Sequence, residues 1–339
     1  MASRFLILCA TYLFFFFLAV SSESSGEETI FDVRNYGGRG DGQRDNAFAF
    51  AKTWNEACQW SKGSSTVYIP PGIFFIRQKN PNCRTLAMNL GFAFVRSSKI
   101  DGLRSVNSKM GHINFFSVQN FNVTGVTITA PGDSPNTDGI KIGKSKDMHI
   151  YNVTIGTGDD CIAILDGTTN LNISDVRCGP GHGISVGSLG RNKGEEDVEG
   201  LTVRDSVFNG TSDGLRIKTW AKSRSQILVS NFLYDNIQMI NVGNPIIIDQ
   251  QYCPHGLCDS PGKYDSLVQI KDVKYNKIWG TSTSKEALKI ECSKTHPCQD
   301  VELSNIDLKY VGHDGLVTAL CENVGGSVHG KIVPGDCRI

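Results

Sequence analysis

Four segments of the sequence repeat one pattern and decide the fold: Thr137-Asp-Gly-Ile-Lys-Ile142, Asp159-Asp-Cys-Ile-Ala-Ile164, Gly181-His-Gly-Ile-Ser-Val186 and Ser212-Asp-Gly-Leu-Arg-Ile217. Each copy ends in an alternation that is typical of a strand with one buried face. A second alternating segment lies between the copies, for example Met148-His-Ile-Tyr-Asn-Val153. Short strands repeated in tandem, with a period of about 22 residues, are typical of a parallel β-helix, whose stacked coils bury the core together.

The pattern continues towards both ends of the chain when its first apolar position is aligned. The aligned residues are Ile113, Ile140, Ile162, Ile184, Leu215, Leu288 and Leu316. We expect them to stack as one buried column of an all-β fold, a single-stranded right-handed parallel β-helix. The Asn-rich segments between the copies also predict polar ladders at the corners of the coils, repeated at the strand spacing of about 4.8 Å.

The competing architecture is a doubly wound α/β sheet, which needs amphipathic helices between its strands. Only the segment 46–61 has apolar residues at helical spacing, among them Phe48, Phe50 and Trp54. A single helix near the N-terminus is better explained as a short cap that covers the open end of a β-helix.

The composition excludes two broad classes of protein. Lysine and arginine number 34 and aspartate and glutamate number 34, so the net charge is zero, which argues against a nucleic-acid-binding protein. Hydrophobic residues make up 40% of the chain and charged residues 20%, which excludes a disordered chain. The 36 glycines favour many tight turns over long helices.

The N-terminal residues are typical of a secretory signal. Arg4 precedes an apolar run from Phe5 to Val20, and the small residues after it predict cleavage near Ser22. The run falls short of the ~20 residues that a membrane span needs, which disfavours the alternative of a retained signal anchor. We therefore predict a signal peptide over residues 1–22 and one β-helix domain over residues 23–339, with no membrane attachment after cleavage.

The cysteines are consistent with export. Cleavage of the signal peptide removes Cys9 and leaves an even number of cysteines, which in an exported protein suggests disulfide bonds. Short spacings suggest the pairs Cys161–Cys178, Cys253–Cys258, Cys292–Cys298 and Cys321–Cys337. Cys58 and Cys83 are left to pair with each other or to stay free. A zinc site is disfavoured, since no CxxC pair is present. Four sequons, at Asn122, Asn152, Asn172 and Asn209, are candidates for glycosylation.

The repeats place chemical groups in register. In the alignment Asp138, Asp160 and His182 share one column and Asp159 lies beside it, while the cations of the last copy, Arg216 and Lys218, project from the strand that follows. Carboxyl groups so close together raise the pKa of at least one of them. One protonated and one ionised carboxyl are the groups that hydrolyse a glycosidic bond.

Four motifs resemble those of a known family. Asn136-Thr-Asp138, Gly158-Asp-Asp-Cys161, Gly181-His-Gly183 and Arg216-Ile-Lys218 look like the signature motifs of polygalacturonases, glycoside hydrolase family 28, and occur in the family order. The segment Asp166-Gly-Thr-Thr-Asn170, together with Glu-Glu-Asp-Val further on, is similar to the pollen-type exopolygalacturonases of plants. The resemblance covers roughly residues 31–337.

The resemblance implies a secreted cell-wall enzyme that hydrolyses the α-1,4-galacturonosyl bonds of pectin with inversion. It favours exo action, at the chain ends, over endo action within the chain. It implies that Asp159 is the general acid and that Asp138 and Asp160 orient and deprotonate the water, with acid and base about 6.5–9.5 Å apart. His182 would maintain the protonation of the acid or the fit of the sugar. No cofactor or metal is implied, and the protein is expected to be a monomer.

The resemblance also implies substrate-binding residues. Arg216 and Lys218 would bind the galacturonate carboxylate, since a guanidinium gives a paired contact and an ammonium a compact charge. Asn136 would support the site by hydrogen bonding, and Tyr275 matches a tyrosine that contacts substrate. Three cations are weaker candidates on other grounds than the resemblance. Lys141 faces the groove by its place in the repeat, and Arg191 and Lys193 lie in the loop after Leu189, where their charge would attract a polyanion. Asp213 is interpreted as a turn residue and His112 as structural.

The chain departs from the family in one place. Residues 77–82 replace about two to three coils, on the order of 60 residues by the repeat length, which usually precede the segment around Cys83. This gap leaves a second hypothesis open, a catalytically impaired polygalacturonase-like protein that binds the cell wall. A calcium-dependent pectate lyase, also β-helical, is a weaker third.

Overall fold

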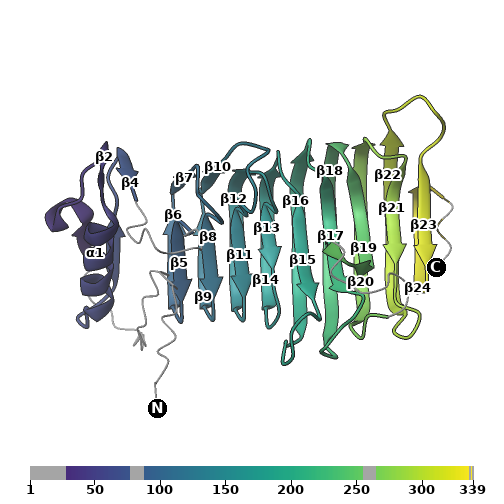
Figure 1. Ribbon diagram of the computed structural model, residues 1–339, viewed down its shortest axis with the longest axis horizontal. Helices are drawn as coiled ribbons and strands as arrows, with labels where there is room; N and C mark the ends of the chain where they lie inside the picture. Colours follow the sequence, from purple (N-terminus) through teal and green to yellow (C-terminus); the bar gives the residue numbers. More distant parts are fainter. Residues whose placement is uncertain (1–27, 77–87, 255–264, 336, 338–339) are drawn as a thin grey trace, which may run out of the picture.

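The computed structural model describes residues 28–76, 88–254, 265–335 and 337, and shows one elongated stack of coils (Figure 1). All strand pairs in it are parallel, as in the example of Ile140 beside Ile162. The nine-stranded sheet consists of β5 (Leu90–Ala93), β8 (Ile113–Phe116), β11 (Ile140–Gly143), β13 (Ile162–Ile164), β15 (Ile184–Leu189), β17 (Asp213–Trp220), β19 (Asn244–Tyr252), β21 (Glu286–Glu291) and β23 (Thr318–Glu322). The predicted parallel β-helix is therefore confirmed.

The eleven-stranded sheet forms the rest of each coil. It consists of β6 (Arg96–Asp101), β7 (Arg104–Val106), β9 (Gln119–Thr124), β10 (Thr127–Thr129), β12 (Lys146–Gly156), β14 (Thr169–Cys178), β16 (Val198–Asn209), β18 (Leu228–Val242), β20 (Gln269–Ser282), β22 (Cys298–Tyr310) and β24 (Val324–Val333). From β11 to β24 the odd-numbered strands belong to the nine-stranded sheet and the even-numbered strands to the eleven-stranded sheet, so the backbone passes from one sheet to the other in each coil.

The register of the nine-stranded sheet confirms most of the predicted column. Ile113, Ile140, Ile162, Ile184 and Leu215 are successive partners in neighbouring strands, as expected. The next coil, however, contributes Ile246, which the alignment missed because its strand begins Asn244-Pro and carries no Asp-Gly or His-Gly pair. Leu288 follows as predicted.

The last position of the column was predicted wrongly. Leu316 is 86% exposed and lies outside any strand, and the partner of Leu288 is Ala319. His313-Asp-Gly-Leu316 copies the letters of the repeat, but they fall in the turn that precedes β23. The last described coil has a neighbour on one side only, so a large apolar side chain there has fewer residues to pack against.

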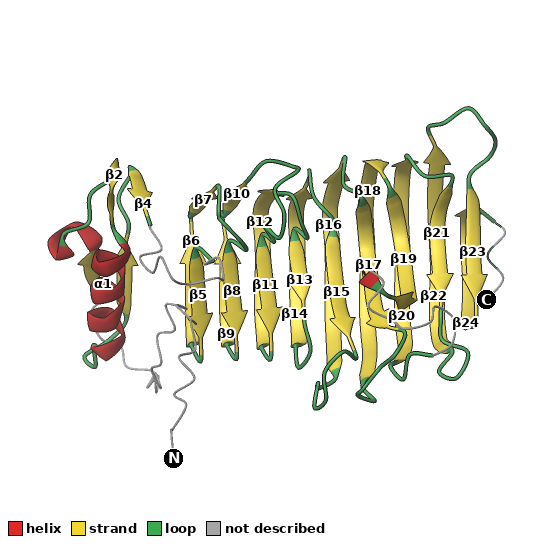
Figure 2. Cartoon of the chain, viewed as in Figure 1, coloured by secondary structure: helices red, strands yellow, loops and turns green. Residues whose placement is uncertain are grey.

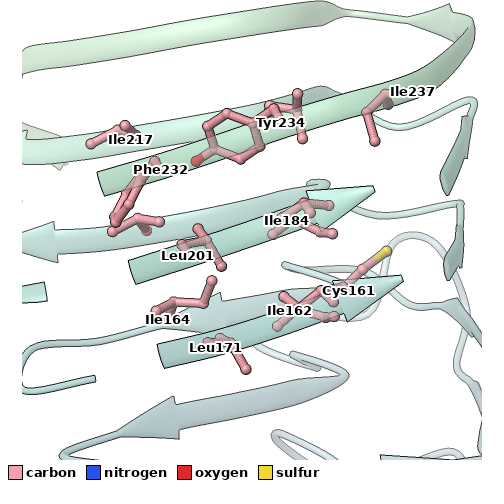
Figure 3. Packing of buried hydrophobic residues seen from close by; sticks show 14 of the residues in the cluster. Cys161, Ile162, Ile164, Leu171, Ile184, Leu201, Ile217, Phe232, Tyr234 and Ile237 are labelled. Carbon is pink, nitrogen blue, oxygen red and sulfur yellow. The ribbon is translucent and has the colours of Figure 1, made fainter. Parts of the chain in front are cut away.

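The core lies between the two sheets and consists mainly of aliphatic side chains, with some aromatic rings and cysteines among them (Figure 3). Residues such as Ile162, Ile184 and Leu201 are at most 2% exposed. The disulfide between Cys161 and Cys178 joins the residue just before β13 to the end of β14 in the same coil. The buried residues of successive coils form one continuous cluster, so that no coil needs a core of its own.

Polar ladders occupy the corners, as predicted. Many Asn and Asp residues there have positive φ angles, including Asp147, Asn170 and Asp205. Asn170 donates to Asp147 at 3.0 Å and Asn236 donates to Asp205 at 2.6 Å, each between neighbouring coils. Asn and Asp tolerate this left-handed conformation better than other side chains, which explains their recurrence at the bends.

The N-terminal unit caps the stack (Figure 2). It contains β1 (Thr29–Asp32), η1 (Val33–Tyr36), β2 (Asp41–Asp45), α1 (Ala47–Gln59), β3 (Ser65–Tyr68) and β4 (Ile73–Phe75). The predicted helix is confirmed, and its Trp54 packs edge-on against Phe92 of the first coil at 5.4 Å. Phe48 is 74% exposed and so does not belong to the buried face, where Ala49 and Ala57 lie instead.

Three predicted disulfides are present, at Cys161–Cys178, Cys292–Cys298 and Cys321–Cys337. Cys253 is also disulfide-bonded, while its predicted partner Cys258 and also Cys83 lie outside the described residues. Cys58 is a free thiol, and burial raises its pKa to about 11.

Two predictions about the N-terminal half lie outside the described part. The signal peptide over 1–22 and the gap at 77–82 both fall on residues whose placement is not described. Among the described residues, no helix is both long enough and apolar enough to cross a membrane.

The corrected register can be tested with two matched substitutions. Leu288→Ala should lower the free energy of unfolding by about 2–5 kcal/mol, because Leu288 is fully buried. Leu316→Ala should change it by less than about 0.5 kcal/mol, because the side chain is exposed. Urea denaturation followed by circular dichroism measures both, and equal effects would contradict the assignment of the last coils.

Candidate active site

Consecutive strands of the nine-stranded sheet bring the predicted site residues together. Asp138 lies just before β11, Asp159 and Asp160 lie just before β13, and His182 lies just before β15. All four therefore lie where neighbouring strands of the sheet begin. Gly183 makes the bend after His182 possible: its φ angle is +81°, and a Cβ atom would lie 2.3 Å from the carbonyl oxygen of Asp213.

Asp160 and Lys218 form the most buried ion pair of the site. The Lys218 Nζ atom lies 3.0 Å from Asp160 Oδ2, and the Ser185 hydroxyl donates to Asp160 Oδ1 at 2.6 Å. Asp160 is 3% exposed and Lys218 is 8% exposed. Both carboxylate oxygens therefore accept hydrogen bonds, and the one from Lys218 is charge-assisted.

Asp159 is paired with His182 at a distance of 3.2 Å between Oδ1 and Nδ1. Burial opposes ionisation of Asp159, but hydrogen bonds from His182 and from the Asp160 amide outweigh it, and the pKa of Asp159 is lowered. The hydrogen bond to Asp159 also raises the pKa of His182, against the effect of burial. The ion pair thus favours a proton on the imidazole and a charge on the carboxylate.

Asp138 has the opposite character. Burial raises the pKa of Asp138, and the charges of Asp159 and Asp160 add to this effect, whereas Lys141 opposes it from 2.6 Å. The three neighbouring carboxyls are therefore not equivalent. Asp138 holds a proton more readily than an ordinary aspartate, and Asp159 less readily.

Arg216 is held by Asp213, whose Oδ2 atom lies 2.9 Å from Arg216 Nη1. Asn244 of the next strand donates to the other oxygen of Asp213 at 2.9 Å. Asp213 was interpreted as a turn residue, but it begins β17 and is 7% exposed. The structure corrects that interpretation, since the side chain orients the guanidinium from the start of the same strand.

Sequence analysis missed Tyr252, which contacts both cations. The Arg216 guanidinium carbon lies 5.6 Å from the centre of the Tyr252 ring and the Lys218 Nζ atom lies 5.8 Å from it. Tyr252 ends β19, the strand whose first apolar residue the repeat alignment also missed. Recognising that coil would have placed Tyr252 beside the two cations.

The prediction that Tyr275 contacts substrate is wrong. Tyr275 has no exposed surface, and its ring stacks on Tyr234 in the core at 4.9 Å (Tyr234 is visible in Figure 3). Its neighbours in β20, Lys274 and Asn276, point outward, because side chains alternate between the faces of a strand. Asn136 is exposed, and its side chain forms no hydrogen bond with the described residues.

The arrangement supplies the groups for acid–base chemistry on an anionic ligand. One side-chain donor atom from each of Asp159, Asp160 and His182 lies within 4.8 Å of the others, so a cation could be held by them. In the described part of the chain, however, these atoms already have partners in Lys218, Ser185 and one another. One carboxylate oxygen of Asp159 and one of Asp160 thus lie close together at the start of the same strand.

Comparison with known proteins identifies relatives of the chain. Residues 76–330 match the family model described as Glycosyl hydrolases family 28. An exopolygalacturonase from Platanus acerifolia is 37% identical over 377 residues, covering 92% of this chain and 98% of the relative. An exopolygalacturonase from Oenothera organensis is 44% identical over 260 residues, covering 77% of this chain and 71% of the relative.

A solved structure shares the fold. The hyperthermoactive exopolygalacturonase from Thermotoga maritima has a TM-score of 0.59 at 17% identity, covering 90% of this chain and 94% of that one. The Platanus alignment, at 377 residues, is longer than the 339 residues of this chain and so contains gaps in it. The relative therefore contains residues that this chain lacks, and the absence of coils at 77–82 stays a prediction.

The ion pair of His182 predicts a pH window for stability. The pKa of His182 is raised, so its contribution is complete below the unfolded value of about 6.5 and is lost as the pH rises through the folded pKa. The pKa of Asp159 is lowered, so its contribution is complete above about 3.9 and is lost as the pH falls. His182→Gln should therefore destabilise the protein most between about pH 4 and 6.5.

Urea denaturation at pH 3, 5 and 8 measures this dependence. His149→Gln, at an exposed histidine of the other sheet, serves as control and should show no maximum at pH 5. A loss of stability for His182→Gln that is the same at pH 5 and pH 8 would show that the ion pair does not form.

Proposed function

The chain belongs to glycosyl hydrolase family 28 and is a glycoside hydrolase of the polygalacturonase kind. From this premise we propose that the protein is secreted to the cell wall. There it releases galacturonate from the chain ends of pectin, with inversion at the anomeric carbon. The observation that carries the proposal is the pairing of an acidic cluster with two cations: Lys218 touches the carboxylate of Asp160, and Arg216 lies on the same strand as Lys218. Neutral sugars would not need such cations, whereas each galacturonate carries a carboxylate that they can bind.

Asp159 is the proposed general acid. Its low pKa without substrate means that the proton of the pair resides on His182, 3.2 Å away. Bound galacturonate brings further negative charge and excludes water, and both effects raise the pKa of a carboxyl. The proton can then move from the imidazole Nδ1 to the Asp159 carboxylate, which donates it to the departing glycosidic oxygen as that bond breaks.

Asp138 is the better of the two proposed bases. A carboxylate with a raised pKa accepts a proton more readily, and burial raises the pKa of Asp138. Asp160 has both oxygens engaged by Lys218 and Ser185, so its role is to orient the attacking water. In this scheme the water oxygen bonds to the anomeric carbon from the face opposite the departing oxygen, and its proton passes to Asp138.

Exo action and secretion rest on different observations. The names of the plant relatives support exo action, because the Platanus and Oenothera proteins are both exopolygalacturonases. The disulfides support secretion, since such bonds persist in oxidising compartments. The proposed substrate is polygalacturonate alone, without cofactor, and the proposed active form is a monomer.

A second candidate is a wall-binding protein with impaired catalysis. It is favoured by the N-terminal unit, whose strands form two separate two-stranded sheets and do not continue either long sheet of the stack. If that unit closes the stack poorly, the chain would bind pectin without turning it over. Co-sedimentation with pectin, together with a reducing-end assay on the same sample, separates the two candidates.

Replacing the proposed acid should abolish most turnover. Asp159→Asn should lower kcat on polygalacturonate by about 10²–10⁴-fold with little change in KM, because a positioned general acid contributes that much. A substrate with an activated aryl leaving group needs no acid, so its hydrolysis should be far less affected. The control is Asp175→Asn at an exposed corner, where other coils carry Asn. Full activity of Asp159→Asn would exclude this role.

The products distinguish exo from endo action. A digest of defined oligogalacturonates should yield galacturonate and the oligomer shortened by one residue at early times, because only the terminal bond is cut. Proton NMR of the first product should show the inverted anomer. A mixture of intermediate oligomers from the start would contradict exo action, and retention would contradict the proposed roles of Asp138 and Asp160.

A further inference from the structure

We propose that Arg191 forms a second carboxylate-binding site, which takes a galacturonate residue other than the one bound by Arg216 and Lys218. The proposal deepens the proposed function and rests on it. Arg191 belongs to the loop between β15 and β16, and its guanidinium carbon lies 5.0 Å from the centre of the Trp220 ring. A guanidinium stacked on an aromatic face keeps its in-plane N–H donors available for a carboxylate.

The aromatic platform under Arg191 is the ring of Trp220, which is held in place and connects to the active site through Tyr252. Trp220 is 7% exposed and its indole Nε1 donates to the Ser188 hydroxyl at 3.0 Å. Its ring meets Tyr252 edge-on at 6.0 Å, and Tyr252 in turn lies against Arg216 and Lys218. Two contacting aromatic rings therefore carry three cations, and the two nearest the acid cluster are the proposed carboxylate binders.

The loop holds Arg191 in place from both sides. The Gly190 carbonyl accepts from the Arg224 amide at 2.7 Å, and the Asn192 carbonyl accepts from the Ser225 hydroxyl at 2.7 Å. The backbone amides of Gly190 and Asn192 both donate to the carboxylate of Glu195. The residue between these anchors is thus positioned before any ligand binds, which lowers the entropic cost of binding.

The charge of Arg191 is not neutralised by its surroundings. The acidic residues of the same loop have other partners: Glu195 binds loop amides, Glu196 binds Lys144 at 2.8 Å, and Asp197 accepts from the Leu228 amide at 2.7 Å. Within the described residues Arg191 has no ion pair, whereas Arg216 and Lys218 each have one. An exposed, oriented and unpaired guanidinium is suited to an anionic ligand.

The spacing separates this site from the first. Leu189, which leads into the loop, pairs with Thr219, three residues beyond Arg216 in β17. At the strand rise of about 3.3 Å per residue, the loop begins roughly 10 Å along the sheet from Arg216. The two guanidinium groups therefore start from backbone positions that lie apart along the sheet, and they stack on different rings, Trp220 and Tyr252. The proposal accordingly assigns Arg191 a different acidic sugar of the same chain.

The test compares Arg191→Ala with Lys193→Ala, an exposed cation of the same loop that lacks an aromatic platform. With trigalacturonate at low salt, Arg191→Ala should raise KM about tenfold and change kcat less than twofold, because a charge-assisted contact to bound substrate is lost. Lys193→Ala should change KM less than twofold. Arg191→Lys keeps the charge without the planar fork and should fall between them.

The outcomes separate this inference from the proposed function. If the wild type neither binds nor cleaves trigalacturonate, the proposed function is wrong and the inference fails with it. If the wild type is active and Arg191→Ala keeps its KM, or matches Lys193→Ala, the inference alone is overturned. A loss confined to kcat would also overturn it. Calorimetric titration of trigalacturonate into Asp159→Asn, with and without Arg191→Ala, should show the same tenfold weakening without turnover.

Discussion

The in-register stacking of parallel coils is the constraint on which the structure depends. Ile140, Ile162, Ile184 and Leu215 are partners in consecutive strands, and this register fixes the position of every residue that precedes them. A slip by one residue would turn the buried column outward, which the continuous apolar core forbids. Asp138, Asp160 and His182 meet because each stands two residues before a member of that column.

Stacking acidic residues in one column is costly, and the site offsets that cost locally. Each of the three carboxyls has a cationic or imidazole partner: Lys141 for Asp138, His182 for Asp159 and Lys218 for Asp160. Burial raises the pKa of Asp138 in spite of Lys141, whereas hydrogen bonds from His182 and the Asp160 amide outweigh burial at Asp159 and lower its pKa. The same packing that gathers the acids thus also makes them unlike one another, as acid–base catalysis requires.

Local patterns in the sequence predicted most of the fold, since alternation and repeat length both follow from contacts between neighbouring coils. The coil at Ile246 escaped because Asn244-Pro245 replaces the usual polar pair, and Leu316 misled because the letters of the repeat also suit a turn. The resemblance pointed to Tyr275, but the alternation of β20 turns its side chain into the core. Tyr252 escaped together with the coil at Ile246, because its place beside the cations follows from the pairing of β19 with β17.

The position of the active site within the stack limits its dependence on the N-terminal end. The strands that carry Asp138, Asp159 and His182 have neighbours on both sides, with β8 and β5 between them and the N-terminal unit. In a stack of coils, contacts are mainly between nearest neighbours, so a change at one end weakens as it passes along the coils. A change at the N-terminal end therefore reaches the acid cluster through the contact between the first two coils. There Phe92 of β5 stacks on Phe115 of β8 at 5.4 Å. Loss of coils beyond that point would shorten the binding surface before it altered the geometry of the acids.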